Sequence, residues 1–187
     1  MLRIMSRAEL NPISYVVLGL VARDGPITSY GLKQAADRGP ARLWQFRHTQ
    51  LYTEPARLAE AGLLRERREP GGRRRRTYTI TKAGRQALEA WVTDPSAGEV
   101  LLRDESVMKL YFGAFSSPEA IAGLAQTRAA EFREGYQEIL EAEQRLLARG
   151  DRPHQLTVLR WGLRFVELMA GFWDEVAADP GAERTGT

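Results

Sequence analysis

A run of four arginines is the densest group of charged side chains in this sequence. The run consists of Arg73, Arg74, Arg75 and Arg76. Two glycines precede it and the alternating residues Tyr78-Thr79-Ile80 follow it. Because positive φ costs glycine little, paired glycines favour tight hairpin turns, so residues 71–81 predict a short β-hairpin with a cationic tip. Such a tip suits contact with a phosphate backbone, and a solvated charge run is the alternative interpretation.

Other reactive groups are sparse. The 187 residues contain no cysteine and two histidines, His48 and His154, and we find neither a glycine-rich phosphate loop nor metal-spaced carboxylates. Disulfides, thiolate metal sites and cysteine nucleophiles are excluded, and we expect no enzyme, cofactor or metal site. No stretch approaches the roughly 18 apolar residues of a membrane span, so we expect a cytoplasmic protein.

Charge is divided unevenly along the chain. Residues 1–94 contain 17 Arg and Lys against 9 Asp and Glu, a net charge of +8, and the remaining 10 basic and 15 acidic residues give −5. The helix-breaking residues 94–98 lie between the two parts. We therefore predict two domains: a basic one over residues 1–94 that meets nucleic acid and a helical one over residues 95–187 that meets protein.

The basic half has the element order of a winged helix-turn-helix. Apolar spacing and capping residues predict a helix from Asn11-Pro12 to Asp24, a second from Thr28 or Ser29 to Gly39, and a third ending near Gly62. Strands follow over residues 63–68 and 76–80, and Thr81 caps a helix over residues 82–92. The predicted fold is mostly α, an α+β winged helix with a two-stranded wing. In this architecture the third helix enters the major groove and the wing contacts the flanking backbone.

An ordered set of motifs runs through residues 13–92: Leu18-Gly19-Leu20, Gly25-Pro26, Ser29-Tyr30-Gly31-Leu32, Gln50-Leu51-Tyr52, Arg57-Leu58-Ala59-Glu60-Ala61-Gly62-Leu63 and Tyr78-Thr79-Ile80-Thr81-Lys82-Ala83-Gly84-Arg85. With these motifs the stretch resembles the PadR family of transcriptional regulators. The resemblance implies a dimeric bacterial repressor with an N-terminal winged helix and a C-terminal helical dimerisation domain. The chain departs from the family where Thr53 follows Tyr52 in place of the usual proline, and Ser29 stands where glycine is common. Since Pro55 removes a backbone donor, we expect either a kink in the third helix or a regular start nearer Thr53.

The candidate DNA contacts come from three elements. At the start of the third helix, His48, Thr49, Gln50 and Tyr52 offer groups for base edges or phosphates. Further contacts are expected from Arg57 to a phosphate, from Tyr30 and Lys33 on the second helix to the backbone, and from the four wing arginines. Two alternatives stay open: Tyr30 and Tyr52 are core or interface tyrosines, and Arg57 pairs with Glu54 or Glu60.

The C-terminal half predicts helices built for dimerisation. The apolar stretch over residues 100–114 is followed by a helix that opens at Ser117-Pro118 and carries a heptad seam about 30 residues long, roughly 45 Å. A last helix over residues 154–178 is apolar on two faces. One chain has enough elements to cover one of these faces, so we expect a second copy of the chain to cover the other. The predicted homodimer interface comprises Phe132, Tyr136, Ile139, Leu146, Leu159, Leu163, Val166 and Trp173.

A cluster of aromatic residues raises the question of an effector. Trp91, Trp161 and Phe165 are candidates for a pocket that holds a small hydrophobic ligand, and core filling is the alternative. The sequence as a whole predicts a sequence-specific regulator of double-stranded DNA, a repressor that binds a pseudo-palindromic operator as a homodimer. The alternative is a protein-interaction adaptor in which the winged helix has lost DNA binding and the arginines meet an acidic partner.

Overall fold

The structure is a computed structural model of the whole chain, and it describes residues 10–39, 49–68, 75–150 and 153–181. The chain divides into two compact units, Met1–Glu99 and Val100–Thr187. Each unit has its own buried cluster of apolar side chains, so each is described by itself.

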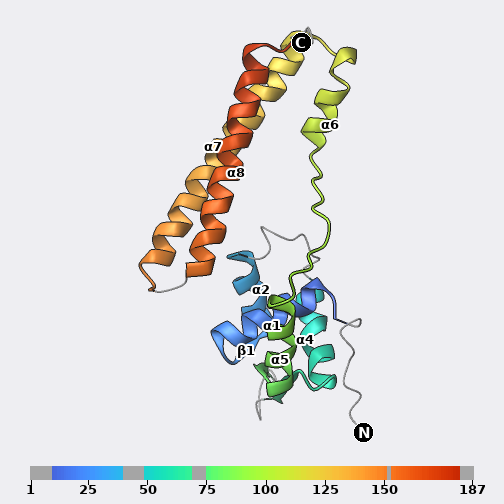
Figure 1. Cartoon of the computed structure of the whole chain (residues 1–187), viewed down its shortest axis with the longest axis vertical. Coiled ribbons are helices and arrows are strands. Elements are labelled where there is room, and N and C mark those ends of the chain that lie inside the picture. Colours follow the sequence, from blue (N-terminus) through green and yellow to red (C-terminus); the bar gives the residue numbers. More distant parts are fainter. Residues whose placement is uncertain (1–9, 40–48, 69–74, 151–152, 182–187) are drawn as a thin grey trace. The chain divides into compact units, whose positions relative to one another are not determined.

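The first unit contains the helices and strands expected of a winged helix (Figure 1). In chain order they are α1 (Pro12–Asp24), β1 (Ile27–Thr28), α2 (Ser29–Asp37), α4 (Gln50–Glu60), β2 (Leu64–Arg68), β3 (Arg76–Ile80) and α5 (Lys82–Val92). The predicted fold class is confirmed, and the bounds of β3 and α5 coincide with the predicted ones. The second helix ends at Asp37, two residues before the predicted Gly39.

Side-chain caps explain why three of these helices begin where they do. Asn11 accepts a hydrogen bond from the amide of Ser14 at the start of α1, and the Ser14 hydroxyl accepts one from the amide of Asn11. Thr28 caps α2 and Thr81 caps α5 in the same way. Each cap satisfies an amide that the first turn of a helix leaves without a backbone partner.

The wing is part of a three-stranded antiparallel sheet in the order β1-β3-β2. Strand β2 pairs with β3 from Leu64 opposite Ile80 to Arg68 opposite Arg76. The short strand β1 extends the sheet on the other side of β3, which corrects the prediction of two strands alone. Two residues are too few to show an alternating pattern, so the sequence could not reveal β1.

The core of the first unit lies where α1 meets α2, α4 and the sheet. Its fully buried members include Leu18, Leu32, Leu51 and Leu58, and Tyr78 of β3 covers the same cluster. Helix α1 supplies buried side chains on nearly every side, as a central helix must. The outer faces of α2 and α4 are left to the solvent.

Helix α4 begins at Gln50, so the alternative of a regular start nearer Thr53 is wrong. Pro55 lies inside the helix with its side chain fully buried. Because proline has no amide hydrogen, the carbonyl of Leu51 loses its usual partner four residues on. Burial of the proline ring in the apolar core offsets part of that loss.

The second unit is dominated by a long antiparallel helix pair, α7 (Pro118–Leu147) and α8 (Pro153–Ala178) (Figure 1). Before it come α6 (Glu105–Tyr111) and a 3₁₀ turn, Gly113–Phe115. The Ser117 side chain caps α7 with Pro118 in the first turn, as predicted. Residues 100–104 are not helical, so the first helix of this half is shorter than the apolar stretch indicated.

The heptad seam of α7 faces α8 of the same chain. Phe132 meets Phe165 edge-on with ring centroids 6.5 Å apart, and the side chain of Ile139 lies against Gly162. Val166 lies beside Gly135 in the same way. The seam residues predicted for the dimer interface are thus half-buried within one chain. A heptad pattern specifies a helix partner but does not say whether that partner belongs to the same chain.

Trp173 corrects the predicted interface more directly. Its side chain is 0% exposed in the single chain, where it packs in one cluster with Ala125 and Ala129 of α7. The two alanines leave room for the indole, which is how helices achieve dense packing. A side chain without exposed surface cannot contact a second chain, so Trp173 belongs to the hairpin core.

Helix α8 also carries the second apolar face that its sequence predicted. Val158, Trp161, Leu168 and Phe172 recur at intervals of three, seven and four residues and are exposed in the single chain. Among the described residues, no helix has the length and apolar character needed to cross a membrane. The uncovered face of α8 is therefore the candidate surface for dimerisation.

Candidate nucleic-acid interface

The exposed face of α4 is polar at its start. Leu51, Glu54, Pro55 and Leu58 are buried, and this spacing of three and four residues turns the rest of the helix outward. The outward residues in the first turn are Thr49, Gln50, Tyr52 and Thr53. They bring hydroxyl and amide groups to the helix end that enters a groove in winged helices. His48, the other predicted reader, lies outside the described residues.

Two predicted contacts on α2 lie on the surface beside this face. Tyr30 is 61% exposed and Tyr52 is 47% exposed, so the alternative of core tyrosines is wrong for both. Lys33 binds Asp37 at 2.7 Å. That hydrogen bond is the main reason why the pKa of Lys33 is raised above its usual 10.5, with smaller contributions from Tyr52 and Tyr30. Lys33 is therefore a permanent cation next to the two tyrosines.

Arg57 adopts the alternative that the sequence left open. Its Nε donates to Glu54 Oε2 at 2.9 Å and its Nη2 to Glu54 Oε1 at 2.5 Å. The partner is thus Glu54, three residues earlier, and the pair extends to Ser14 of α1 through Nη2. Neither Ser14 nor Glu54 was predicted from the sequence to be a polar core residue. The available signal was a carboxylate at a position where the periodicity of α4 calls for an apolar side chain.

One acidic residue holds part of the basic wing. Glu66 of β2 accepts a hydrogen bond from Arg68 Nε at 2.6 Å, lies 3.7 Å from Arg76 Nη1 and accepts a hydrogen bond from the Tyr78 hydroxyl at 3.3 Å. The hydrogen bond from Arg68, and then the charge of Arg76, lower the pKa of Glu66. Arg75 is exposed, while Arg73 and Arg74 lie outside the described residues.

Two further arginines of the wing were not predicted from the sequence. The register places Arg65 opposite Thr79 and Arg67 opposite Thr77, on the face of the hairpin that does not carry Glu66. Both arginines are exposed and neither pairs with an acid among the described residues. The signal was present in the alternation of residues 65–68, because every second residue of a strand shares a face.

The arrangement is suited to holding a polyanion. In the part of the chain that is described, no three His, Asp or Glu side chains gather closely enough to hold a metal ion. What the first unit does present is a polar helix face, a lysine with two tyrosines, and a hairpin with arginines on both sides.

Comparison with known proteins places this arrangement in a family. Residues 17–90 match the transcriptional regulator PadR-like family, over the span that carries the predicted motifs. Residues 17–90 form a PadR-like domain. Residues 102–179 match a second family, the C-terminal region of virulence activator alpha. This PadR-like chain is accordingly a DNA-binding transcriptional regulator and not an enzyme, and the adaptor alternative is set aside.

The relatives of this PadR-like regulator agree in sequence and fold. The negative transcriptional regulator PadR of Bacillus subtilis is 23% identical over 79% of this chain and 86% of its own. The crystal structure of that protein with operator DNA has a TM-score of 0.79 at 20% identity, covering 90% of this chain and 98% of the other. Its complex with p-coumaric acid has a TM-score of 0.73 at 21% identity, covering 90% and 97%. The Vibrio cholerae virulence activator AphA has a TM-score of 0.64 at 26% identity, covering 90% and 97%.

The aromatic residues predicted for an effector pocket lie in different units of the PadR-like chain. Trp91 belongs to α5 and stacks on Tyr15, with ring centroids 4.7 Å apart. Trp161 and Phe165 belong to α8 and stack on each other at 5.8 Å. The effector pocket stays a prediction, and each aromatic has a packing role within its own unit.

Proposed function

We propose that this PadR-like regulator is a repressor that binds a pseudo-palindromic operator in double-stranded DNA as a homodimer. The observation that carries the proposal is the polar face of α4 lying beside Tyr30 and Lys33, in a fold that matches PadR on operator DNA. The name of the related B. subtilis protein, a negative regulator, supports repression.

Within this proposal the two surfaces of the DNA-binding unit have different tasks. Thr49, Gln50 and Tyr52, together with His48, read base edges or nearby phosphates from the start of α4. Tyr30 and Lys33 hold the sugar-phosphate backbone. The arginines of the wing, at positions 65, 67 and 73–76, add affinity that depends on salt, because each neutralised phosphate releases counterions.

Homodimerisation is assigned to the second unit. The exposed face formed by Val158, Trp161, Leu168 and Phe172 is too apolar to be left in water without a partner. Helix α6 adds further exposed apolar side chains at Val107, Met108 and Tyr111. A two-fold axis through such surfaces would present two winged helices to two half-sites, which is why we expect a pseudo-palindromic operator.

Release by a small hydrophobic effector completes the proposal. The related PadR has been crystallised with p-coumaric acid, a flat aromatic acid, which supports an effector of similar shape here. Of the predicted aromatic residues, we assign to it Trp161 and Phe165 of α8, which stack on each other. We further propose that the protein acts in the cytoplasm, where its DNA is located.

Duplex binding across a salt series tests the proposal. The probe is a labelled duplex from the region upstream of the chain's own gene, found by footprinting, and the readout is fluorescence anisotropy. We expect tight binding with a steep negative dependence of log K on log salt. Replacing Arg73, Arg74, Arg75 and Arg76 by alanine should flatten the slope by about 0.9 for each phosphate that is no longer neutralised. No binding to the duplex at low salt would contradict the proposal.

A further inference from the structure

Glu54 is a carboxylate in the core of the DNA-binding unit. It is 6% exposed and stands in line with Leu51, Pro55 and Leu58 on the buried side of α4. A charge in such a position costs desolvation energy, which an apolar side chain of similar size would avoid. Its presence therefore calls for an explanation other than packing.

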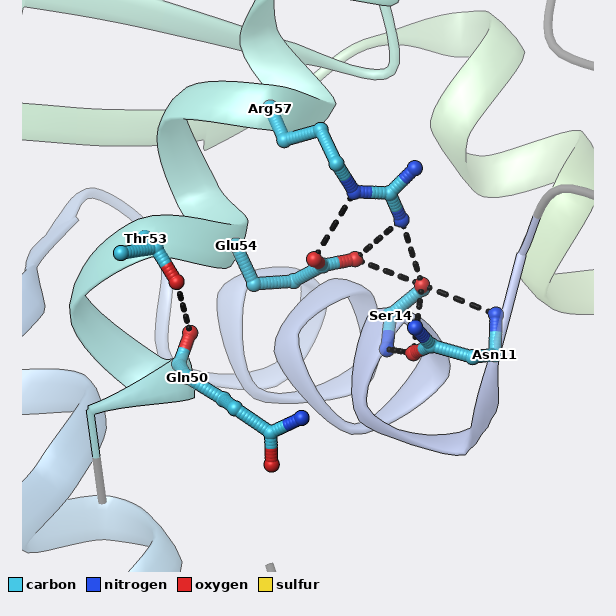
Figure 2. A network of polar contacts seen from close by, with 6 residues as sticks. All are labelled: Asn11, Ser14, Gln50, Thr53, Glu54 and Arg57. Carbon is cyan, nitrogen blue, oxygen red and sulfur yellow. Dashed lines mark hydrogen bonds and ion pairs between the residues drawn. The ribbon is translucent and has the colours of Figure 1, made fainter. Parts of the chain in front are cut away.

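The carboxylate is held by a set of directional contacts (Figure 2). The hydroxyl of Ser14, a residue that is 0% exposed, donates to Glu54 Oε1 at 2.6 Å. The same hydroxyl accepts from the amide of Asn11 at 3.1 Å and from Arg57 Nη2 at 3.0 Å. Asn11 Oδ1 lies 3.0 Å from the same hydroxyl, but Glu54 is nearer and takes its one hydrogen, so the donor and both acceptor positions of Ser14 are used. Arg57 closes the set by its two hydrogen bonds to Glu54.

This network joins α4 to the first turn of α1. Ser14 is at once the capping partner of Asn11 and the acceptor for Arg57, so the position of α4 is tied to the start of α1. Apolar contacts are not directional and tolerate sliding, whereas hydrogen bonds to a charged group depend on geometry. The network therefore fixes the rotation of α4 about its own axis.

Rotation of α4 matters because its exposed residues include those proposed to read DNA. Gln50 and Thr53 are exposed, and in Figure 2 neither side chain takes part in the contacts around Ser14. A side-chain tip lies about 6 Å from the axis of a helix, so a rotation of about 10° moves it by about 1 Å. A shift of that size is enough to spoil a hydrogen bond to a base edge.

We infer that Glu54 is a positioning residue for DNA recognition, which acts through Ser14 and Arg57 to hold α4 in its reading orientation. The inference rests on the proposed operator binding. In this role Arg57 serves the protein side of the interface and makes no phosphate contact, so its removal alters operator preference without changing the number of phosphates neutralised.

The isosteric variant Glu54→Gln tests the inference, with Glu60→Gln as its matched control. Glu60 is an exposed carboxylate at the end of the same helix. Both proteins and the wild type are titrated with the footprinted upstream duplex and with an unrelated duplex of equal length, over a salt series. For Glu54→Gln we expect about tenfold weaker binding to the upstream duplex, the equivalent of one base contact. Its affinity for the unrelated duplex and its salt slope should equal those of the wild type. The control Glu60→Gln should equal the wild type in its affinity for both duplexes and in its salt slope.

A second variant keeps the test decisive if Glu54→Gln does not fold. Replacing both members of the ion pair, as in Glu54→Met with Arg57→Met, removes the two charges together and leaves neither of them unpaired. A folded double variant should again lose preference for the upstream duplex while keeping its salt slope. A slope smaller by about 0.9 would mean that Arg57 neutralises a phosphate, and would overturn the inference.

The remaining outcomes separate this inference from the proposed function. If the wild type prefers the upstream duplex and Glu54→Gln prefers it equally, the network only stabilises the fold and the inference is wrong. If the wild type has no preference for that duplex, the proposed operator binding fails instead. Circular dichroism and thermal unfolding of each variant confirm that folded proteins are being compared.

Discussion

At the scale of single residues, the wing shows that an arginine's value for DNA binding depends on its neighbours within the protein. Arg68 is held by Glu66 at 2.6 Å, whereas Arg65 and Arg67 lie on the other face of the same strand. An arginine already paired with a carboxylate gains less from a phosphate, because the pair must first be broken. Strand alternation, more than the number of arginines, therefore decides which of them are available.

This difference can be measured by salt dependence. We expect the double variant Arg65→Ala with Arg67→Ala to reduce the slope of log K against log salt by up to about 2. This corresponds to about 0.9 for each phosphate that is no longer neutralised. Arg68→Ala, the matched control on the same strand, should reduce it by clearly less. Equal effects of all three arginines would show that the pairing with Glu66 is broken on DNA.

Glu66 itself gives a prediction for pH. Its pKa is lowered below the ordinary 4.5, chiefly by the hydrogen bond from Arg68, so the charged form stabilises the folded state. That stabilisation is complete above the unfolded-state pKa and is lost as pH falls through the lower folded-state pKa. Glu66→Gln should cost about 1 kcal/mol at pH 7, since the pair is only partly buried. Thermal unfolding at pH 7 and pH 3 checks this: the gap between variant and wild type should close in acid.

At the scale of elements, the helix starts were predictable because each is encoded by a few adjacent residues. Asn11, Thr28, Thr81 and Ser117 all cap helices as expected, since a capping side chain acts only on the turn that follows it. Strand β1 and the regular start of α4 at Gln50 were not predicted. Both depend on contacts with distant parts of the chain, which override local preference.

A glycine at the start of α5 shows how closely the elements approach. A Cβ atom added to Gly84 would lie 2.2 Å from the carbonyl oxygen of Leu63, the oxygen that also accepts from the Thr81 amide and hydroxyl. Gly84→Ala should therefore force α5 away from the turn before β2 and destabilise the unit by about 1–3 kcal/mol.

Chemical denaturation of Gly84→Ala measures the change. Gly123→Ala is the matched control, because Gly123 lies in α7 with no other atom within 4 Å of the added Cβ. This control should be neutral or slightly stabilising, as expected for glycine to alanine within a helix. A Gly84→Ala protein as stable as the wild type would contradict the close approach.

At the scale of the whole molecule, the helix pair has two apolar surfaces with different partners. The seam of α7 packs within one chain, and the outer face of α8 is the surface proposed to pack against a second chain. Phe132, Ile139 and Val166 contact the opposite helix of the same hairpin, so charged substitutions there should unfold the hairpin. Leu168 is 70% exposed and makes no such contribution to the core. Substitutions at these two kinds of site should therefore separate effects on folding from effects on dimerisation.

Light scattering tests this division. The wild type should have about twice the 21.0 kDa mass of the chain. Leu168→Asp should give a folded monomer, since it places a charge on the proposed interface at little cost to the single chain. Phe132→Asp should lose helical structure instead, and Arg164→Ala, an exposed neighbour on α8, should remain dimeric. A Leu168→Asp protein that stays dimeric would remove this face from the interface.

The sequence by itself determined the element order, most helix starts and the family, because capping, periodicity and ordered motifs are local properties of the chain. It also indicated that α8 has two apolar faces. The tertiary structure decided which partner each face meets: the α7 seam is covered within the chain, and Trp173 is enclosed by Ala125 and Ala129. It also decided that Arg57 turns to Glu54 and Ser14. The contact of Arg57 with Ser14 joins residues 43 positions apart, and the contacts of Trp173 likewise join distant parts of the chain. A pattern along the chain records the type of side chain but not which distant group will lie beside it.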